Sequence, residues 1–255
     1  MSVNIKEISK DELVKKMFDL GAHFGYARES RHASTKPFLF GLKNKTVIID
    51  LEKTADSLAT ACEFAKSIGM AKKNIILVGT KKEAATVIQN IAVEYDLPYV
   101  NERWIGGTMT NFKQIRSRID RLIDLKDQEA KGELSKYTKK ERGVIAKEVS
   151  DLERYFASLI TLTKLPGAIF VVDSKKESIA VAEAIKLSIP VIALANSDCD
   201  IRGISHPIVA NDAQLKVIDF FAREIAEAHK EGLRESDKKA AEATAQATET
   251  AKVVA

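Results

Sequence analysis

The sequence has few of the features that mark secreted, disulfide-bonded or membrane proteins. Its 255 residues include two cysteines, Cys62 and Cys199, which lie far apart and form no CxxC pair. This count excludes a disulfide framework and a zinc ribbon. No apolar run reaches the length of about 18 residues that a membrane span needs, and the first residues lack the apolar core of a secretory signal. We therefore expect a protein of the reducing cytosol with no membrane partner.

A large excess of charge of one sign is also absent. The chain has 40 Lys and Arg residues against 36 Asp and Glu residues, which gives a net charge of +4. A protein that only clamps RNA would usually be more basic, because each neutralised phosphate requires a cation. The total charge allows a nucleic-acid partner without requiring one, so the positions of the cations matter more than their sum.

Short, continuously apolar runs alternate with amphipathic segments along most of the chain. The runs cover residues 47–49, 75–78, 99–100, 168–172, 190–194 and 208–209. Apolar strands that alternate with helices indicate βαβ units, and hence a parallel sheet with helices on both faces. The sequence therefore predicts an α/β fold that is doubly wound, with a mostly parallel, Rossmann- or flavodoxin-like sheet. A last helix is expected from Asp212 to near Lys230.

Residues 105–165 interrupt this alternation. Two segments carry apolar residues at heptad-like spacings, namely Phe112, Ile115, Ile119 and Leu122, then Ile145, Val149, Leu152, Phe156 and Leu159. Two such seams joined by a polar link predict an inserted antiparallel coiled-coil helical hairpin. Residues 1–104 and 166–230 then form a globular domain with an N-terminal helix. Residues 231–255 are rich in Ala, Thr, Glu and Lys, and we expect a disordered low-complexity tail there.

The most informative stretch, NERWIGGTMTNF, covers residues 101–112 at the start of the insertion. Gly106 and Gly107 allow the backbone to approach a partner closely. Arg103 can donate to a phosphate in bidentate geometry, and Trp104 offers either a stacking face or a plug into the core. Spacing alone leaves two alternatives open, a rigid elbow that anchors the hairpin or a contact with RNA.

This stretch resembles the signature of the bacterial small-subunit ribosomal protein two family. Further elements resemble that family in the same order along the chain: GAHFGY (21–26), KPFLFG (36–41), VIIDLEKT (47–54), ILVGTKKEA (76–84), GAIFVVD (167–173) and IPVIAL (189–194). The resemblance extends from about residue 9 to residue 228. The sequence departs from the family pattern at Tyr26 and at residues 205–207, and in two longer segments, residues 31–35 and residues 196–201.

The resemblance implies a structural constituent of the small ribosomal subunit, cytoplasmic and ribosome-bound, and not an enzyme. It implies binding to small-subunit rRNA and to neighbouring ribosomal proteins, including help in docking ribosomal protein one, with no cofactor and no small-molecule substrate. The residues expected to contact rRNA are Arg103, Thr108, Thr110, Asn111, Lys113 and Arg116, then His23, Arg28 and Lys36. Trp104, Gly106 and Gly107 are expected to shape the hinge.

Two rival readings use the same fold. A nucleotide-binding enzyme would need glycines in the first βα turn, and residues 50–53, DLEK, contain none. The turn at residues 79–82, GTKK, has a single glycine and is typical of an ordinary βα turn with surface lysines. A scaffold that dimerises through its hairpin would need a longer heptad seam. A divalent-metal site is a further alternative, whose candidate ligands are His23, Asp198, Asp200, His206 and Asp212.

Overall fold

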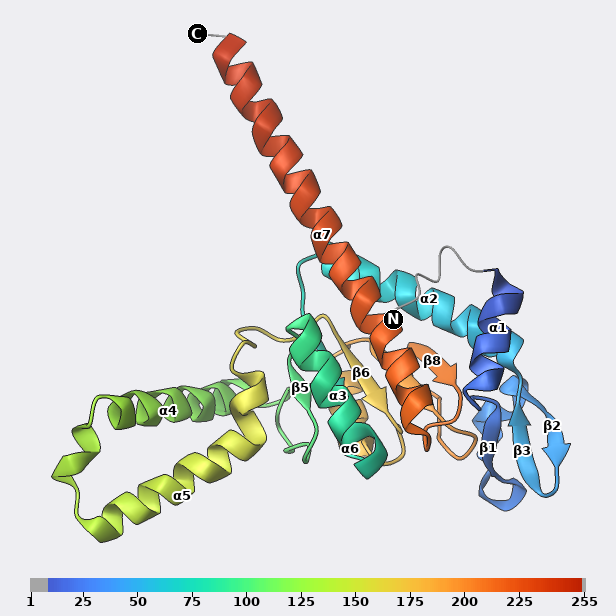
Figure 1. The fold of residues 1–255 in the computed structure, drawn as a ribbon, viewed down its shortest axis with the longest axis horizontal. Helices are drawn as coiled ribbons and strands as arrows, with labels where there is room; N and C mark the ends of the chain where they lie inside the picture. Colours follow the sequence, from blue (N-terminus) through green and yellow to red (C-terminus); the bar gives the residue numbers. More distant parts are fainter. Residues whose placement is uncertain (1–8, 254–255) are drawn as a thin grey trace.

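A five-stranded parallel sheet forms the centre of the molecule (Figure 1). The computed structural model describes residues 9–253, with side chains described for residues 9–239. The strands are β4 (Ile75–Val78), β5 (Tyr99–Val100), β6 (Ala168–Val172), β7 (Val191–Ala195) and β8 (His206–Val209). Their order, β5-β4-β6-β7-β8, is the flavodoxin-like order, with a switch in winding direction between β4 and β6. The predicted α/β fold with a parallel sheet is confirmed.

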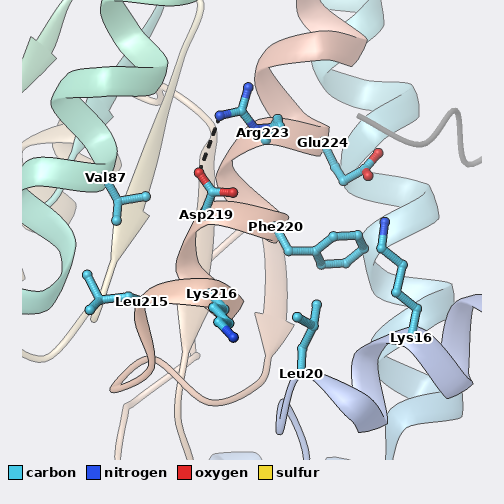
Figure 2. A pocket seen from close by; sticks show the side chains of 9 residues that line it. All are labelled: Lys16, Leu20, Val87, Leu215, Lys216, Asp219, Phe220, Arg223 and Glu224. Carbon is cyan, nitrogen blue, oxygen red and sulfur yellow. Dashed lines mark hydrogen bonds and ion pairs between the residues drawn. The ribbon is translucent and has the colours of Figure 1, made fainter. Parts of the chain in front are cut away.

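Helices cover both faces of this sheet because its strands are apolar on both faces. One layer contains α1 (Lys10–Asp19), α2 (Leu51–Met70), α3 (Lys82–Tyr95) and α7 (Leu215–Val253). The other contains α4 (Phe112–Ala130), α5 (Lys139–Phe156) and α6 (Ser178–Lys186). Helices α1, α3 and α7 border a groove on the surface of the first layer (Figure 2).

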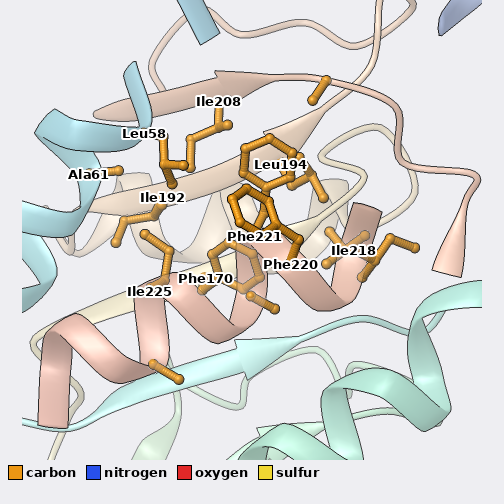
Figure 3. Close-up of a cluster of buried hydrophobic side chains, with 14 of the residues drawn as sticks. Leu58, Ala61, Phe170, Ile192, Leu194, Ile208, Ile218, Phe220, Phe221 and Ile225 are labelled. Carbon is orange, nitrogen blue, oxygen red and sulfur yellow. The ribbon is translucent and has the colours of Figure 1, made fainter. Parts of the chain in front are cut away.

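Successive residues of each central strand enter different cores. Ile75 and Leu77 pack with the first layer, whereas Ile76 and Val78 pack with the second. In the first core, Phe170 of β6 lies against Phe221 of α7, and both are fully buried (Figure 3). This period of two is the reason that the strands read as uninterrupted apolar runs.

A separate three-stranded antiparallel sheet contains β1 (Phe24–Ala27), β2 (Leu39–Lys43) and β3 (Thr46–Ile49), in the order β1-β3-β2. Two short 3-10 helices, η2 (Arg28–Ser30) and η3 (Ala33–Phe38), join β1 to β2. The prediction that residues 47–49 form the first strand of the parallel sheet was therefore wrong. Val47 and Ile49 are buried while Thr46 and Ile48 are half-buried, as in a sheet with one covered face. A run this short does not reveal its pairing partner.

Helices α4 and α5 lie between β5 and β6 in the chain. Helix α4 leads away from the sheet, a link containing η4 (Glu133–Lys136) follows, and α5 returns to η5 (Ala157–Leu159) (Figure 1). Ion pairs connect the two helices, Arg121 to Glu148 at 3.4 Å and Lys126 to Glu153 at 2.5 Å. Apolar residues of both helices join the second core, which ties their inner ends to the sheet.

Helix α7 is longer than the sequence predicted. The expected end near Lys230 was wrong, because the helix continues to Val253. Its extension is bound to α2: Lys66 pairs with Glu231 and Glu235, and a Cβ on Gly232 would lie 2.1 Å from the Lys66 carbonyl oxygen. Such a close backbone approach requires glycine. Of the predicted tail, residues 254–255 lie outside the described range. Within that range, no helix has the length and apolar character needed to cross a bilayer.

Candidate nucleic-acid interface

The elbow, residues 101–111 between β5 and α4, converges on one carboxylate. Glu183 of α6 accepts hydrogen bonds from three backbone N–H groups, those of Gly107 at 2.6 Å, Met109 at 3.0 Å and Thr110 at 3.0 Å. It also accepts from the Trp104 indole Nε1 at 3.2 Å and from the Thr110 hydroxyl at 3.2 Å. A single acidic side chain therefore fixes the conformation of the whole elbow.

Glu183 is ionised in this setting although its residue is only 8% exposed. Burial raises the pKa of its carboxyl group. The hydrogen bonds from Thr110, Gly107, Met109 and Trp104 lower the pKa by more than burial raises it, so the pKa lies below its usual value. A loop of this type can offer convergent N–H groups to an external anion. In this elbow the Glu183 carboxylate already occupies them.

The signature residues of the elbow are mainly structural. Trp104 is 5% exposed and Thr108 is 2% exposed, and the Thr108 hydroxyl donates to the Ile105 carbonyl at 2.6 Å. Gly107 has a φ of +94°, which disfavours any other residue. Trp104 is thus a plug in the second core and not a stacking face.

Other elbow residues face solvent. Arg103, Thr110 and Asn111 are exposed, as is Lys113 in the first turn of α4. Arg103 and Lys113 form no ion pair with any residue in the described part of the chain. Asn111 occupies the N-cap position of α4, but its side chain makes no capping hydrogen bond. The elbow and the first turn of α4 therefore each present one unneutralised cation.

Arg116 is committed within the fold. Its guanidinium donates to the Ile160 carbonyl at 2.9 Å and pairs with Asp120, also at 2.9 Å. The first bond connects α4 to the segment that follows η5, and the ion pair lies within α4. The structure thus places Arg116 as a brace at the base of α4, half-buried and not presented for phosphate contact.

The remaining predicted residues lie elsewhere, around β1 and η3, so the predicted set does not form one surface (Figure 1). Arg28 and Lys36 are exposed there. His23 stacks between Phe18 and Phe24, with ring centroids 4.3 Å and 4.0 Å apart. Burial and the nearby Lys43 lower the pKa of His23, which favours its neutral form.

The first βα turn of the parallel sheet joins β4 to α3, because β3 belongs to the other sheet. The turn used above to judge nucleotide binding, residues 50–53, was therefore the wrong one. In the β4–α3 turn, Glu177 accepts from the Thr80 backbone N–H at 3.0 Å, and Lys81 pairs with Asp212 at 2.9 Å. Carboxylates of the protein occupy the polar groups that a phosphate would need.

The candidate metal ligands do not assemble. Asp198 pairs with Lys175, Asp200 with Arg202, and Asp212 with Lys81, while His206 stacks on Phe64. Across residues 9–239, no group of three or more His, Cys, Asp or Glu side chains is placed to hold a metal ion. The three aspartates are each neutralised by a lysine or an arginine of the protein.

The two longer segments that depart from the family pattern contact each other. The Ser197 carbonyl accepts from the His32 backbone N–H and from the Thr35 hydroxyl, both at 2.9 Å. In return, the Ser34 hydroxyl accepts from the Ile201 backbone N–H at 3.1 Å. The departures at residues 31–35 and 196–201 thus form a single matched contact, which no property of either segment alone could have revealed.

Glu183 is the residue that sequence reasoning missed. One signal was present: Ala180, Val181 and Ala184 make the inward face of α6 apolar, and Glu183 shares that face. A charged residue at an inward helical position requires a buried partner. The identity of that partner depends on the tertiary structure.

The groove bordered by α1, α3 and α7 has a volume of about 380 Å³. Leu20, Leu215 and Phe220 supply apolar lining, and the Lys16 ammonium lies 4.5 Å from the centre of the Phe220 ring (Figure 2). Burial raises the pKa of Glu224, at the upper end of this groove, to about 7. The lining of the groove combines apolar side chains with charges of both signs. Such a lining fits an amphipathic segment better than a nucleic acid.

The fold and the elbow define a doubly wound α/β protein whose signature loop is fixed by an internal carboxylate. The family model described as Ribosomal protein S2 matches residues 17–232. Small ribosomal subunit protein uS2 of Chloroflexus aurantiacus is 37% identical over 221 residues, which is 87% of this chain and 93% of that protein. Small ribosomal subunit protein uS2 of Bdellovibrio bacteriovorus is 39% identical over 239 residues, which is 94% of this chain and 76% of that protein. The chain belongs to the ribosomal protein S2 family, a family of structural proteins and not of enzymes.

Proposed function

We propose that this chain is a structural constituent of the small ribosomal subunit, bound to the ribosome in the cytoplasm, where it binds small-subunit rRNA and neighbouring ribosomal proteins. Family membership supports the ribosomal role. The observation that carries rRNA binding is a pair of unneutralised cations, Arg103 on the loop that Glu183 holds rigid and Lys113 in the adjoining first turn of α4. Exposed cations without internal partners are available to phosphates, whose neutralisation releases counterions.

The mechanism is positioning. A loop whose N–H groups are already bound loses little conformational freedom when a partner docks, so the binding free energy is not spent on ordering it. Arg103 supplies a planar guanidinium for bidentate contact with phosphate, and Lys113 supplies a point charge nearby in sequence. Contacts of this kind follow the shape and backbone of the RNA and not its base edges.

We further propose the domain organisation expected from the sequence. Helices α4 and α5 act as a coiled-coil hairpin within residues 105–165, inserted into a globular domain of residues 1–104 and 166–230. The ion pairs between α4 and α5 support this assignment. Beyond the ends that pack on the sheet, most of the α4–α5 hairpin is polar and exposed, which suits docking against a large partner. Limited proteolysis tests the organisation, and it should cut first within residues 131–138 and after residue 239.

The most specific part of the proposal is that the chain helps to dock ribosomal protein one. We test the groove of α1, α3 and α7 as the docking surface. Leu215 is 54% exposed at the groove, so Leu215→Glu should leave the fold intact while it charges the apolar lining. Particles that keep this variant but lose ribosomal protein one support a role for the groove. Unchanged occupancy of ribosomal protein one excludes the groove from the docking site.

Sedimentation of the tagged chain from its own cell lysate tests the function as a whole. We expect it to migrate with the small subunit at low salt and to dissociate progressively at high salt, because phosphate contacts are salt-dependent. RNA probing of each fraction identifies the bound rRNA. Migration as a free protein at low salt, with no rRNA attached, would contradict the proposal.

A further inference from the structure

The β2–β3 hairpin, residues 39–49, carries a two-residue turn at its tip. Lys43 pairs with Thr46, and the turn residues Asn44 and Lys45 have φ values of 49° and 65°. Two successive positive φ values define the type I′ turn that fits the twist of a two-stranded hairpin. Glycine is strongly favoured at the second of these positions, and here it is a lysine.

A β-bulge sets the direction of Phe40 in the same hairpin. Leu39 pairs with Ile49 and Gly41 pairs with Ile48, so Phe40 is the extra residue of β2 with no partner on β3. The ring is 81% exposed. Bulges turn a side chain away from the regular alternation of a strand, and this one leaves a complete aromatic ring in solvent beside a strand edge.

The segment that contains Phe40 is rich in cations. Residues 26–45 contain five Lys and Arg residues and a single acid, Glu29, an excess that equals the net charge of the entire chain. The five are Arg28, Arg31, Lys36, Lys43 and Lys45; all are exposed, and none forms an ion pair with another residue of the described range.

The structure brings three of these cations to the end of the hairpin. The Arg28 backbone N–H donates to the Lys45 carbonyl at 3.0 Å, and Thr46 of β3 pairs with both Ala27 and Lys43. Arg28, Lys43 and Lys45 therefore lie at one end of the three-stranded sheet, and Phe40 precedes Lys43 on the same strand. An aromatic ring beside unneutralised cations is the composition that single-stranded nucleic acid recognises.

We propose that the β2–β3 hairpin is a binding site for single-stranded RNA, in which Phe40 stacks on a base while Arg28, Lys43 and Lys45 contact phosphates. The proposal rests on the proposed rRNA binding and names the class of RNA that this surface takes, an unpaired segment of the small-subunit rRNA. An unpaired segment can splay a base onto an aromatic ring, whereas a base in a duplex is already stacked. The lysine in place of glycine at the turn supports the proposal, because strained backbone conformations cluster at functional sites.

The test measures fluorescence anisotropy of a labelled oligouridine with the full-length chain. Phe40→Leu removes the stacking face and keeps an apolar side chain, and we expect it to weaken binding about tenfold. The double variant Lys43→Gln, Lys45→Asn removes two cations and places asparagine, which tolerates positive φ, at the second turn position. It should reduce the slope of log K against log salt by about 1.4.

A matched control replaces two exposed lysines at the start of α5 with Lys139→Gln and Lys140→Gln, which should leave oligouridine binding unchanged. All five positions of the hairpin and control variants are exposed, so thermal unfolding should remain as in the parent chain. A labelled RNA duplex of equal length should bind more weakly than oligouridine and should not respond to Phe40→Leu.

Sedimentation of the same variants separates this inference from the proposed function. One outcome is that the parent chain joins the small subunit while the hairpin variants bind oligouridine as tightly as the parent does. That result overturns the hairpin site and leaves the proposed function intact. Loss of a ribosomal protein from particles carrying such variants would then assign the hairpin to a protein partner. Failure of the parent chain to join the small subunit contradicts the proposed function, and the oligouridine measurement still decides whether the hairpin binds RNA.

Discussion

The elbow and the β2–β3 hairpin both contain residues suited to RNA, but they use them in opposite ways. In the elbow, the indole N–H of Trp104 and three backbone N–H groups are bound by Glu183. In the hairpin, Phe40 is exposed and the neighbouring cations have no internal partners within residues 9–239. The elbow carries the sequence signature, whereas the hairpin carries an exposed aromatic ring and exposed cations.

The difference teaches that a distinctive motif need not be a contact surface. A buried donor without a partner costs free energy, so the N–H groups of a loop that lies against the core have to be bound by acceptors of the protein itself. Exposed cations have no such requirement, because water solvates them. A cation without an internal partner is therefore the better indicator of an external one.

The largest effect is expected at the elbow. Glu183→Ala leaves several buried donors without an acceptor, and we expect the free energy of unfolding to fall by about 3–5 kcal/mol. Urea denaturation measures it. The matched change in the hairpin, Phe40→Ala, should alter the free energy of unfolding by less than about 0.5 kcal/mol. Equal effects of the two substitutions would remove the distinction between the regions.

The same carboxylate makes the stability of the elbow depend on pH. The pKa of Glu183 is lowered by folding, so its contribution to stability is complete above the pKa of the unfolded chain. That contribution is lost as the pH falls through the folded value, so the free energy of unfolding should decrease between pH 6 and strongly acid solution. Comparison of the parent chain with Glu183→Gln isolates this part. Identical pH profiles for the two would show that Glu183 is not ionised in the fold.

A smaller effect of opposite sign is expected in the hairpin. Lys45→Gly relieves the positive φ of 65° and should increase the free energy of unfolding by about 0.5–1 kcal/mol. The same change removes a cation and should weaken oligouridine binding. Thermal unfolding and anisotropy on one sample measure both. A variant that gains stability and binds RNA as tightly as the parent would show that Lys45 does not contribute to RNA binding.

The smallest change in stability is expected from the exposed cations of the elbow. Arg103→Gln with Lys113→Gln should leave the free energy of unfolding within about 0.5 kcal/mol of the parent value. It should nevertheless weaken association with the small subunit and reduce its salt dependence, because two phosphate contacts are lost. Sedimentation across a salt series measures this. An unchanged salt dependence would restrict the elbow to its structural role.

The parallel sheet could be predicted from the sequence because its strands are apolar on both faces and alternate with helices. Local pattern was sufficient for β4, β6 and β7, which are fully buried. The three-stranded sheet could not be predicted, since β1 and β2 are half-exposed and a bulge at Phe40 breaks the alternation of β2. A short strand with irregular exposure gives no periodic signal.

The candidate site divides in the same way. The sequence identified Arg103, Lys113, Arg28 and Lys36 by residue type, and the structure leaves all four exposed. It could not identify Glu183, because the elbow and α6 are joined only by tertiary contacts. The end of α7 was missed for a similar reason, since the pairs from Lys66 to Glu231 and Glu235 depend on the packing of α7 against α2. Contacts between distant segments leave no periodicity in either one.

Ultraviolet cross-linking of the chain within intact small subunits, followed by mapping of the cross-linked peptides, tests the account most directly. The account predicts cross-links to unpaired rRNA at the hairpin, centred on Phe40 and on residues 43–45, and none at Trp104, which is buried and bound to Glu183. Cross-links confined to Trp104 and its neighbours, with the hairpin unmodified, would contradict it.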